Sequence, residues 1–301
     1  MTRNKIQKSS PLPVREGISP NHIWLPIGNW STMLDFLASR FPEISEAVWR
    51  ERMARGDVVD EQGAVITPLS PYRAGARVYY YRELEAETEI PFEETIIFQD
   101  EHIVVADKPH FLPIAPSGRF LKETLLARLK RKLDIDHLVP MHRLDRETAG
   151  LMIISKNVQT RDLYHALFRE RRITKTYEAL ARLDANRIFP FTYRSRIVEA
   201  KEFYRREEVA GEPNAETHID MIEQRGELAL YKLNPVTGKT HQLRVHMAAL
   251  GIPILNDAYY PILSNWKGDD FSKPLQLLAR SVEFIDPVSG EARRFVSKRE
   301  L

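Results

Sequence analysis

The chain has 301 residues, and its 44 basic and 42 acidic side chains give a formal charge of +2. It contains no cysteine, which excludes a disulfide scaffold, a thiolate metal site and a cysteine nucleophile. The composition, with 43% hydrophobic and 29% charged residues, is that of a globular protein, and because neither a membrane span nor a secretory signal is recognisable we expect a cytoplasmic protein.

The amino-terminal part of the sequence predicts three segments. Residues 1–30 are interrupted by prolines and are expected to form an extended arm. Residues 31–83 are expected to form a small module, with helices over 33–41 and from about Ser45, an apolar pair at 58–59 followed by a turn, and short strands at 65–67 and 78–81. The glutamate-rich segment 84–93 offers little to bury and is expected to be a linker.

Residues 94–301 predict strands mixed with helices. In chain order we expect a hairpin at 96–106, a basic amphipathic helix at 122–133, a buried strand at 151–154, a helix at 158–171, and strands at 176–183, 216–221 and 228–233. A turn and a helix should follow, with Thr240 as the N-cap and Gly251 just past the end. The polar segment 184–214 has no assignable pattern.

Basic residues are concentrated in the middle of the chain. Residues 1–90 hold 11 basic and 12 acidic side chains, whereas residues 119–182 hold 15 and 8, a net charge of +7. Contacts to nucleic-acid phosphates require such a block, although Lys- and Arg-rich helices that face solvent also produce one.

One candidate nucleophile lies within this basic block. Asp145 belongs to the segment HRLDRETAG at 142–150, which is predicted to be a loop. Because Arg143 and Arg146 flank it, its carboxylate should stay ionised and could act as a nucleophile without a helper base. The alternative is that Asp145 pairs with one of these arginines and only fixes the loop.

A second distinctive segment, PVTGKTHQLRVH, covers residues 235–246. Its Gly-Lys-Thr is similar to part of a phosphate-binding loop, but Leu233 occupies the position of the first glycine, which excludes a nucleoside-triphosphate site. His241 and His246 have no third partner at metal-ligand spacing, so we expect no metal site. A third segment, Lys175-Thr-Tyr177, lies on a predicted strand, where Tyr177 would ordinarily be a core aromatic.

In this order, the three segments resemble the RluA-type pseudouridine synthases. The resemblance extends from about residue 94 to the carboxyl end and includes IPILND at 252–257. Residues 31–83 also resemble the small RNA-binding domain first known from ribosomal small-subunit protein four. Two departures are visible: His110-Phe111 follows Lys108-Pro109 where the family usually has a small residue and glycine, and Lys239 stands where arginine is commoner.

The resemblance implies an α+β fold, in which a mixed, mostly antiparallel curved sheet with flanking helices forms a catalytic domain over 94–301, preceded by the small α+β module. It also implies a catalytic Asp145, a Tyr177 that stacks on uracil and could shuttle a proton, and an Arg244 that pairs with Asp145. Arg143 would fill the space left by the extruded base. The remaining substrate-binding residues expected from these segments are His142, Arg146, Thr148, Lys175 and His241.

The implied reaction exchanges a nitrogen–carbon glycosidic bond for a carbon–carbon bond, so it oxidises nothing and needs no cofactor. Extruding the target base costs roughly a few kcal/mol. The carboxylate could add to the base or the sugar, or assist a ribose-derived intermediate, and the sequence does not choose among these routes. An Arg244–Asp145 pair would limit the cost of burying the nucleophile.

We therefore predict an RNA pseudouridine synthase, an isomerase that acts as a monomer on structured ribosomal or transfer RNA, with neither DNA nor a membrane as partner. A catalytically inactive RNA-binding protein of the same fold is the alternative, but such a protein should have lost Asp145, Tyr177 or Arg244. A glycosidase using Asp145 and Glu147 would fit the charge without explaining Tyr177.

Overall fold

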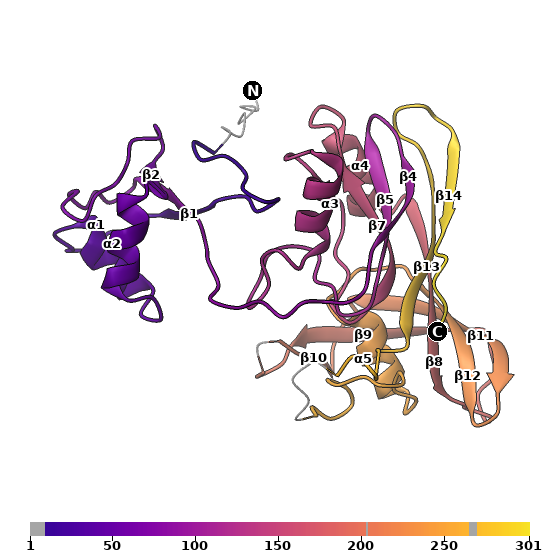
Figure 1. Cartoon of the computed structure of the whole chain (residues 1–301). Helices are drawn as coiled ribbons and strands as arrows, with labels where there is room; N and C mark the ends of the chain where they lie inside the picture. Colours follow the sequence, from indigo (N-terminus) through magenta and orange to yellow (C-terminus); the bar gives the residue numbers. More distant parts are fainter. Residues whose placement is uncertain (1–9, 203, 265–269) are drawn as a thin grey trace. The chain divides into compact units, whose positions relative to one another are not determined.

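The computed structural model describes residues 10–202, 204–264 and 270–301. The chain divides into a small unit that ends at Glu87 and a large unit that begins at Thr88, and each is described by itself (Figure 1). Within the described residues, no helix has the length and apolar character needed to cross a membrane.

The small unit packs two helices on a three-stranded antiparallel sheet. The helices are α1 (Met33–Arg40) and α2 (Glu46–Ala54), and the sheet order is β1 (Asn21–Trp24), β3 (Arg77–Tyr80), β2 (Val58–Asp60). Both predicted helices are confirmed. Thr32 and Asp35 form a capping box at α1, and the Ser45 side chain caps α2. Phe36, Leu37 and Trp49 fill the core between the layers.

Two predictions for this unit need correction. Residues 65–67 form no strand, because the chain turns at Gly63 and only a single bridge joins Val65 to Val59. The Asp60 side chain holds this turn by accepting hydrogen bonds from the backbone of Gln62 and Ala64. The predicted arm also contributes β1 to the sheet. Residues 1–9 of that arm lie outside the described residues.

The large unit is built on one sheet of eleven strands (Figure 1). Its main order is β10-β9-β11-β12-β8-β13-β7-β5-β4, with β14 paired to β13 and β6 to β7. Among the described residues, β7 and β13 are the one parallel pair, so the predicted mixed, mostly antiparallel sheet is confirmed. The strands are β4 (Thr95–Gln99), β5 (Ile103–Lys108), β6 (Val139–Pro140), β7 (Ala149–Ser155), β8 (Ile173–Arg182), β9 (Phe191–Glu199), β10 (Arg206–Val209), β11 (Ala215–Arg225), β12 (Leu228–Pro235), β13 (Leu277–Ile285) and β14 (Ala292–Val296).

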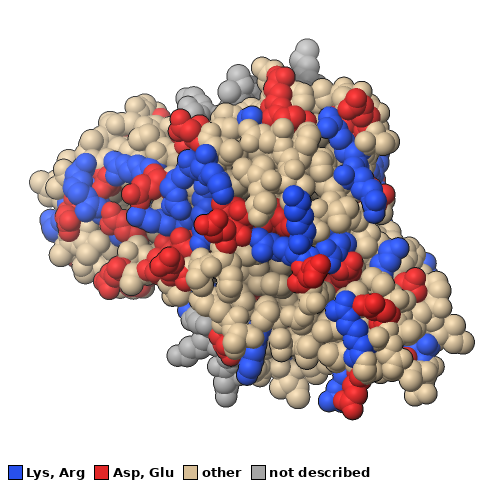
Figure 2. Space-filling view, turned by 45° about the vertical axis from the view of Figure 1, so that its right-hand side comes forward, with Lys and Arg blue, Asp and Glu red and all other residues tan. Residues whose placement is uncertain are grey.

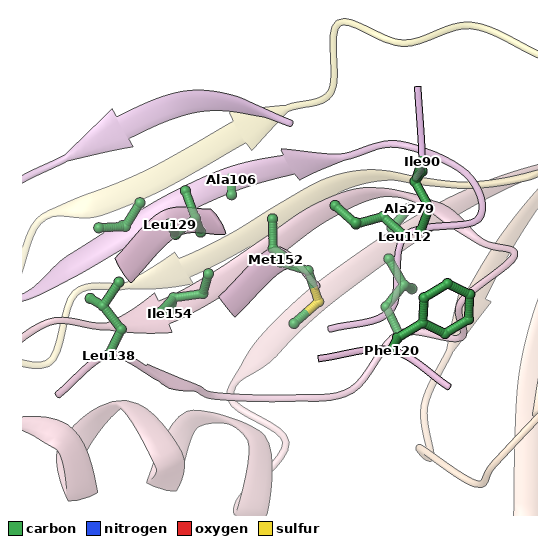
Figure 3. Packing of buried hydrophobic residues seen from close by; sticks show 12 residues of the cluster. Ile90, Ala106, Leu112, Phe120, Leu129, Leu138, Met152, Ile154 and Ala279 are labelled. Atoms are coloured by element: carbon green, nitrogen blue, oxygen red, sulfur yellow. The ribbon is translucent and has the colours of Figure 1, made fainter. Parts of the chain in front are cut away.

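Helices cover both faces of the sheet: α3 (Leu125–Leu133) packs on one face of β5 and β7, and α4 (Arg161–Arg169) on the other. Successive residues of β5 point in opposite directions, so that Val104 contacts the α3 cluster and Val105 the α4 cluster. Figure 3 shows the first cluster, in which Leu129 of α3 lies near Met152 of β7. Burying each such side chain contributes about 1.5–3 kcal/mol, which makes this region a rigid support for the loops at its edge.

The third helix, α5 (Gln242–Ala249), packs against β8, β11 and β12 through Leu243 and Met247. Its predicted N-cap is wrong. His241 is the N-cap, in the left-handed conformation with a φ of 57°, and its side chain makes no capping hydrogen bond. Gly251 follows the helix with a φ of 81°, the conformation that favours glycine after a helix end.

The predicted linker at 84–93 is partly core. Ile90 is 3% exposed, belongs to the α3 cluster, and donates its backbone N–H to Glu123. The glutamate-rich stretch therefore contains one residue, Ile90, that anchors it to the core of the large unit. The unassigned segment 184–214 holds β9 and β10, and the last two strands, β13 and β14, were not predicted either.

Candidate active site

A cavity of about 620 Å³ brings the three sequence motifs together. Its lining combines the loop before β7, the start of β8 and the amino-terminal end of α5, and it includes Asp145, Tyr177 and Arg244. The volume lies in the range of small-molecule and nucleotide sites. Residues separated by up to about a hundred positions in the sequence therefore share one concave site.

The loop that carries Asp145 is fixed by the way it joins the sheet. Gly150 has a φ of 111°, and a Cβ at this position would lie 2.3 Å from the backbone oxygen of Ala279 on β13. Only glycine permits this close approach. Within the loop, the backbone N–H of Thr148 donates to the carbonyl oxygen of Asp145 over 3.2 Å.

Two side chains from the segment after β5 hold the same loop. The buried Lys108 ammonium donates to the carbonyl oxygens of Arg146 (3.0 Å), Pro109 and Leu112, and burial lowers its pKa to about 7. His110 Nδ1 lies 2.7 Å from the carbonyl oxygen of Glu147. The unusual His110 thus adds a second contact to the backbone just beyond Asp145.

Asp145 is a buried but ionised carboxylate. Its side chain is 14% exposed, and its Oδ2 lies 3.3 Å from Nη1 of Arg244 and 3.7 Å from Nε2 of His241. Burial alone would raise the pKa of this carboxyl, but His241, Arg244 and Arg143 outweigh burial and lower it below its ordinary value. The group is therefore ready to act as a nucleophile or base at neutral pH.

Arg244 is 1% exposed and lies among carboxylates. Its Nε and Nη2 form a two-pronged pair with Asp257, at 2.8 and 2.7 Å, while Nη1 faces Asp145 and also lies 3.9 Å from Glu147. Burial would lower the pKa of the guanidinium, but the bond to Asp257 and the surrounding negative charges raise it overall. Arg244 stays charged under all ordinary conditions.

Tyr177 lines the cavity from β8, opposite Leu233 and Ala279 in the sheet. Burial, and then the charge of Asp145, raise the pKa of its phenol well above the ordinary value. The side chain is therefore a neutral phenol that is half-buried in the wall of the cavity. This differs from a core tyrosine, which would be surrounded by protein on all sides.

The other predicted substrate-binding residues occupy different environments. His142 and Lys175 line the cavity, but His142 Nε2 accepts the backbone N–H of Ile153, and burial lowers its pKa to about 4. Thr148 is buried in the lining. Arg146 lies instead in an adjoining cavity of about 670 Å³, which it shares with Arg143 and His241.

Four cations of the first cavity lack a carboxylate partner. Among the residues that the structure describes, Arg143, Arg171, Lys175 and Lys239 have no Asp or Glu oxygen within 4.0 Å. Burial and the charge of Arg171 lower the pKa of Lys175. On the face shown in Figure 2, basic and acidic side chains are interspersed. Uncompensated positive charge around a cavity attracts anions.

Comparison with known proteins agrees with this geometry. A family model described as RNA pseudouridylate synthase matches residues 102–249. The chain is 30% identical over 295 residues to the ribosomal large subunit pseudouridine synthase D of Pseudomonas aeruginosa, and the match covers 88% of this chain and 87% of the relative. The chain belongs to the RNA pseudouridylate synthase family. It is therefore an isomerase that acts on RNA, as the RluA-type resemblance predicted.

Two further relatives of this pseudouridine synthase are informative. This chain is 28% identical over 247 residues to the mitochondrial tRNA pseudouridine(32) synthase of Saccharomyces cerevisiae. The match covers 77% of this chain and 50% of the yeast protein. The structure of Human RNA Pseudouridylate Synthase Domain Containing 1 superposes with a TM-score of 0.58 at 23% identity, over 71% of this chain and 86% of the human chain. The human structure shows that the fold is shared.

The structure adds residues to this synthase's site that the sequence did not single out. Asp257 lay in a motif without an assigned role, and its pairing with Arg244 depends on a loop geometry that spacing does not reveal. Lys108 was noted only as part of a departure from the family pattern. A buried lysine between a strand and a proline was the available signal, but its three carbonyl partners come from the fold.

Proposed function

We propose that this enzyme converts a uridine of structured ribosomal or transfer RNA into pseudouridine, with Asp145 as the nucleophile and the target base extruded into the first cavity. The observation that carries the proposal is the ionised, nearly buried Asp145 that faces Arg244 and shares a cavity with Tyr177. We further propose that it acts in the cytoplasm as a monomer, with residues 94–301 as the catalytic domain.

The chemistry requires little more than these groups. The bond between N1 of uracil and C1′ of ribose breaks, a bond from C5 to C1′ forms, the hydrogen on C5 leaves as a proton, and N1 gains a proton. The Asp145 carboxylate supplies either a transient covalent bond to the base or sugar or stabilisation of a ribose-derived intermediate. The proton lost from C5 balances the proton gained by N1, and because the reaction is an isomerisation no redox partner is needed.

The surrounding residues fit the binding of an extruded base. The face of Tyr177 offers a stacking surface, and base–aromatic stacking contributes about 1–3 kcal/mol. Arg143 is exposed and lines both cavities, so its long planar cation can replace the base that has left the helix. Stacking would offset much of the cost of extrusion.

The four unpartnered cations, Arg143, Arg171, Lys175 and Lys239, support a path for the RNA backbone past the cavity. The small unit, which resembles a ribosomal RNA-binding domain, would add contacts to RNA shape and phosphates. The relatives are named for ribosomal RNA in one case and transfer RNA in the other, so both classes stay within the proposal.

Release of tritium from RNA labelled at uracil C5 tests the nucleophile. Asp145→Asn should abolish release while RNA affinity stays within a few-fold of wild type. Glu147→Gln is the matched control, since Glu147 also faces Arg244 but only from 3.9 Å, and it should retain measurable activity.

Three outcomes would contradict the proposal. Full tritium release by Asp145→Asn would exclude Asp145 as the nucleophile. The absence of pseudouridine after wild-type protein is incubated with unmodified total RNA would favour the inactive RNA-binding protein. Release of free uracil, with equal losses in both variants, would indicate a glycosidase instead.

A further inference from the structure

The loop from Asp257 to Tyr260 contacts both side chains that face the Asp145 carboxylate. We propose that Asp257 and Tyr260 are positioning residues, which hold Arg244 and His241 and make His241 present its Nε2–H to Asp145. The inference rests on the proposed function of Asp145. It assigns a role to a loop that holds the two partners of the nucleophile.

Asp257 determines which edge of Arg244 reaches the nucleophile. Its carboxylate is 1% exposed and takes up Nε and Nη2 of the guanidinium, so that Nη1 is left to face Asp145. The Asp257 carboxylate is itself fixed, because its Oδ1 accepts the backbone N–H groups of Tyr259 (2.8 Å) and Tyr260 (3.2 Å). The rings of these tyrosines lie 4.8 and 5.5 Å from Cζ of Arg244 and limit its movement further.

Tyr260 holds His241 as Asp257 holds Arg244. The Tyr260 hydroxyl lies 2.9 Å from His241 Nδ1 and accepts the backbone N–H of Arg206 over 2.8 Å. A phenol has a single hydrogen to donate. In the proposed arrangement, Arg206 donates to the oxygen and the phenol hydrogen is directed at His241 Nδ1, which is then the acceptor.

This arrangement fixes the tautomer of His241. Burial lowers the pKa of the ring, so it is neutral at neutral pH and carries one hydrogen. With Nδ1 accepting from Tyr260, the hydrogen sits on Nε2, which faces Oδ2 of Asp145 at 3.7 Å. This distance is longer than a hydrogen bond, and such contacts commonly tighten when substrate binds. The other tautomer would point a lone pair at the carboxylate and repel it.

Both contacts therefore act on the same oxygen of the nucleophile. Arg244 supplies a full charge to Oδ2 and His241 supplies an N–H dipole, and the loop sets the direction of each. Displacing a reacting group by about 1 Å costs on the order of a hundredfold in rate. Loss of the loop contacts should thus reduce turnover more than RNA binding.

The first experiment compares Tyr260→Phe with Tyr231→Phe. Tyr231 is the matched control, because its hydroxyl also accepts one backbone N–H, from Asp184, and donates once, to the Arg182 carbonyl oxygen. Nitrogen-15 NMR of the imidazoles, with the His241 signals assigned by His241→Gln, reads the tautomer directly. We expect Nε2–H in wild type and Tyr231→Phe, and a mixture in Tyr260→Phe.

Single-turnover rates and RNA affinity complete the test. Tyr260→Phe should lower the rate about tenfold and Asp257→Asn about a hundredfold, with the dissociation constant for a stem-loop RNA within about twofold. Asp286→Asn is the control for Asp257→Asn, since Asp286 is also buried and accepts two backbone N–H groups of its own loop. That control should lower thermal stability without a specific loss of rate.

A wild-type tautomer and rate in Tyr260→Phe would overturn the proposal. Equal losses of rate and affinity in both loop variants would also overturn it, because they would indicate a role in binding. The tautomer is measured without turnover. Inactivity of the wild-type enzyme on every RNA would therefore refute the proposed function and leave the arrangement of His241 and Tyr260 separately tested.

Discussion

Replacing Arg244 with methionine removes the guanidinium that lies among the carboxylates of Asp145, Glu147 and Asp257. Arg244 contacts Asp257 through two hydrogen bonds, faces Asp145 at 3.3 Å and lies 3.9 Å from Glu147. Methionine fills a similar volume but carries no charge. The variant therefore leaves Asp145 and Asp257 as buried carboxylates without their partner.

The cost follows from this burial. Removing one member of a buried ion pair destabilises a protein by about 3–5 kcal/mol, and Arg244 at 1% exposure belongs in this class. For a unit of this size, each kcal/mol lowers the melting temperature by about 2–4 °C. We expect the Arg244→Met variant to melt about 6–20 °C below wild type at pH 7.

The loss should depend on pH. In wild type the pKa of Asp145 is below its ordinary value, so the stability that this carboxylate contributes is present at neutral pH and is lost as pH falls through the folded-state pKa. In the variant, burial raises that pKa, and protonation relieves the unpaired charge. The difference in melting temperature should therefore shrink as pH falls from 7 towards 4, and the acid limb of activity should move to higher pH.

Thermal unfolding and tritium release, each measured from pH 4 to 8, check these expectations. Arg280→Met serves as the control, because Arg280 pairs with Glu178 on the same sheet but is 21% exposed and does not line the cavity. It should lose less stability and keep the wild-type acid limb. A variant at Arg244 that melts within about 2 °C of wild type, with an unchanged acid limb, would refute the reasoning.

Three other changes have defined outcomes. Gly150→Ala should abolish activity or folding, because the new Cβ meets the Ala279 backbone, and normal kinetics with normal circular dichroism would contradict this. Burial lowers the pKa of His246 to about 4, so its neutral form contributes up to about 3 kcal/mol above pH 6.5 that is lost as pH falls to 4. Urea unfolding across this range should show a flatter curve for His246→Asn than for wild type. Deletion of residues 1–87 keeps the buried Ile90 and should weaken binding to large structured RNA more than it lowers the reaction rate on a short stem-loop. Equal losses of binding to the large RNA and of rate on the stem-loop would count against a separate module.

Local patterns predicted much of the fold. Polar N-cap residues predicted α1 and α2, and apolar runs predicted β5 and β7. These predictions were possible because capping and strand burial depend on only a few neighbouring residues. The strand β9 was missed, since its burial pattern alternates between exposed and half-buried positions and offers little apolar signal. Order in the sheet, and the single parallel pair of β7 and β13, depend on long-range pairing that no local pattern contains.

In the candidate site, too, some residues could be predicted from the sequence and others depend on long-range contacts. Asp145, Tyr177 and Arg244 were identified through motif resemblance, and the structure places them around one cavity. Asp257 and Tyr260 follow α5 on a loop, and nothing in their spacing shows that they contact Arg244 and His241. Such contacts arise only when the chain has folded, so the residues that hold a nucleophile's partners are the hardest to read from sequence.

A map of pseudouridine in cellular RNA tests the central claim most directly. RNA from cells without this protein is compared with RNA from the same cells that express either the wild-type chain or Asp145→Asn. We predict that at least one uridine of ribosomal or transfer RNA is pseudouridine with the wild-type chain and unmodified in the other two samples. An identical map in all three, or restoration by Asp145→Asn, would contradict the account.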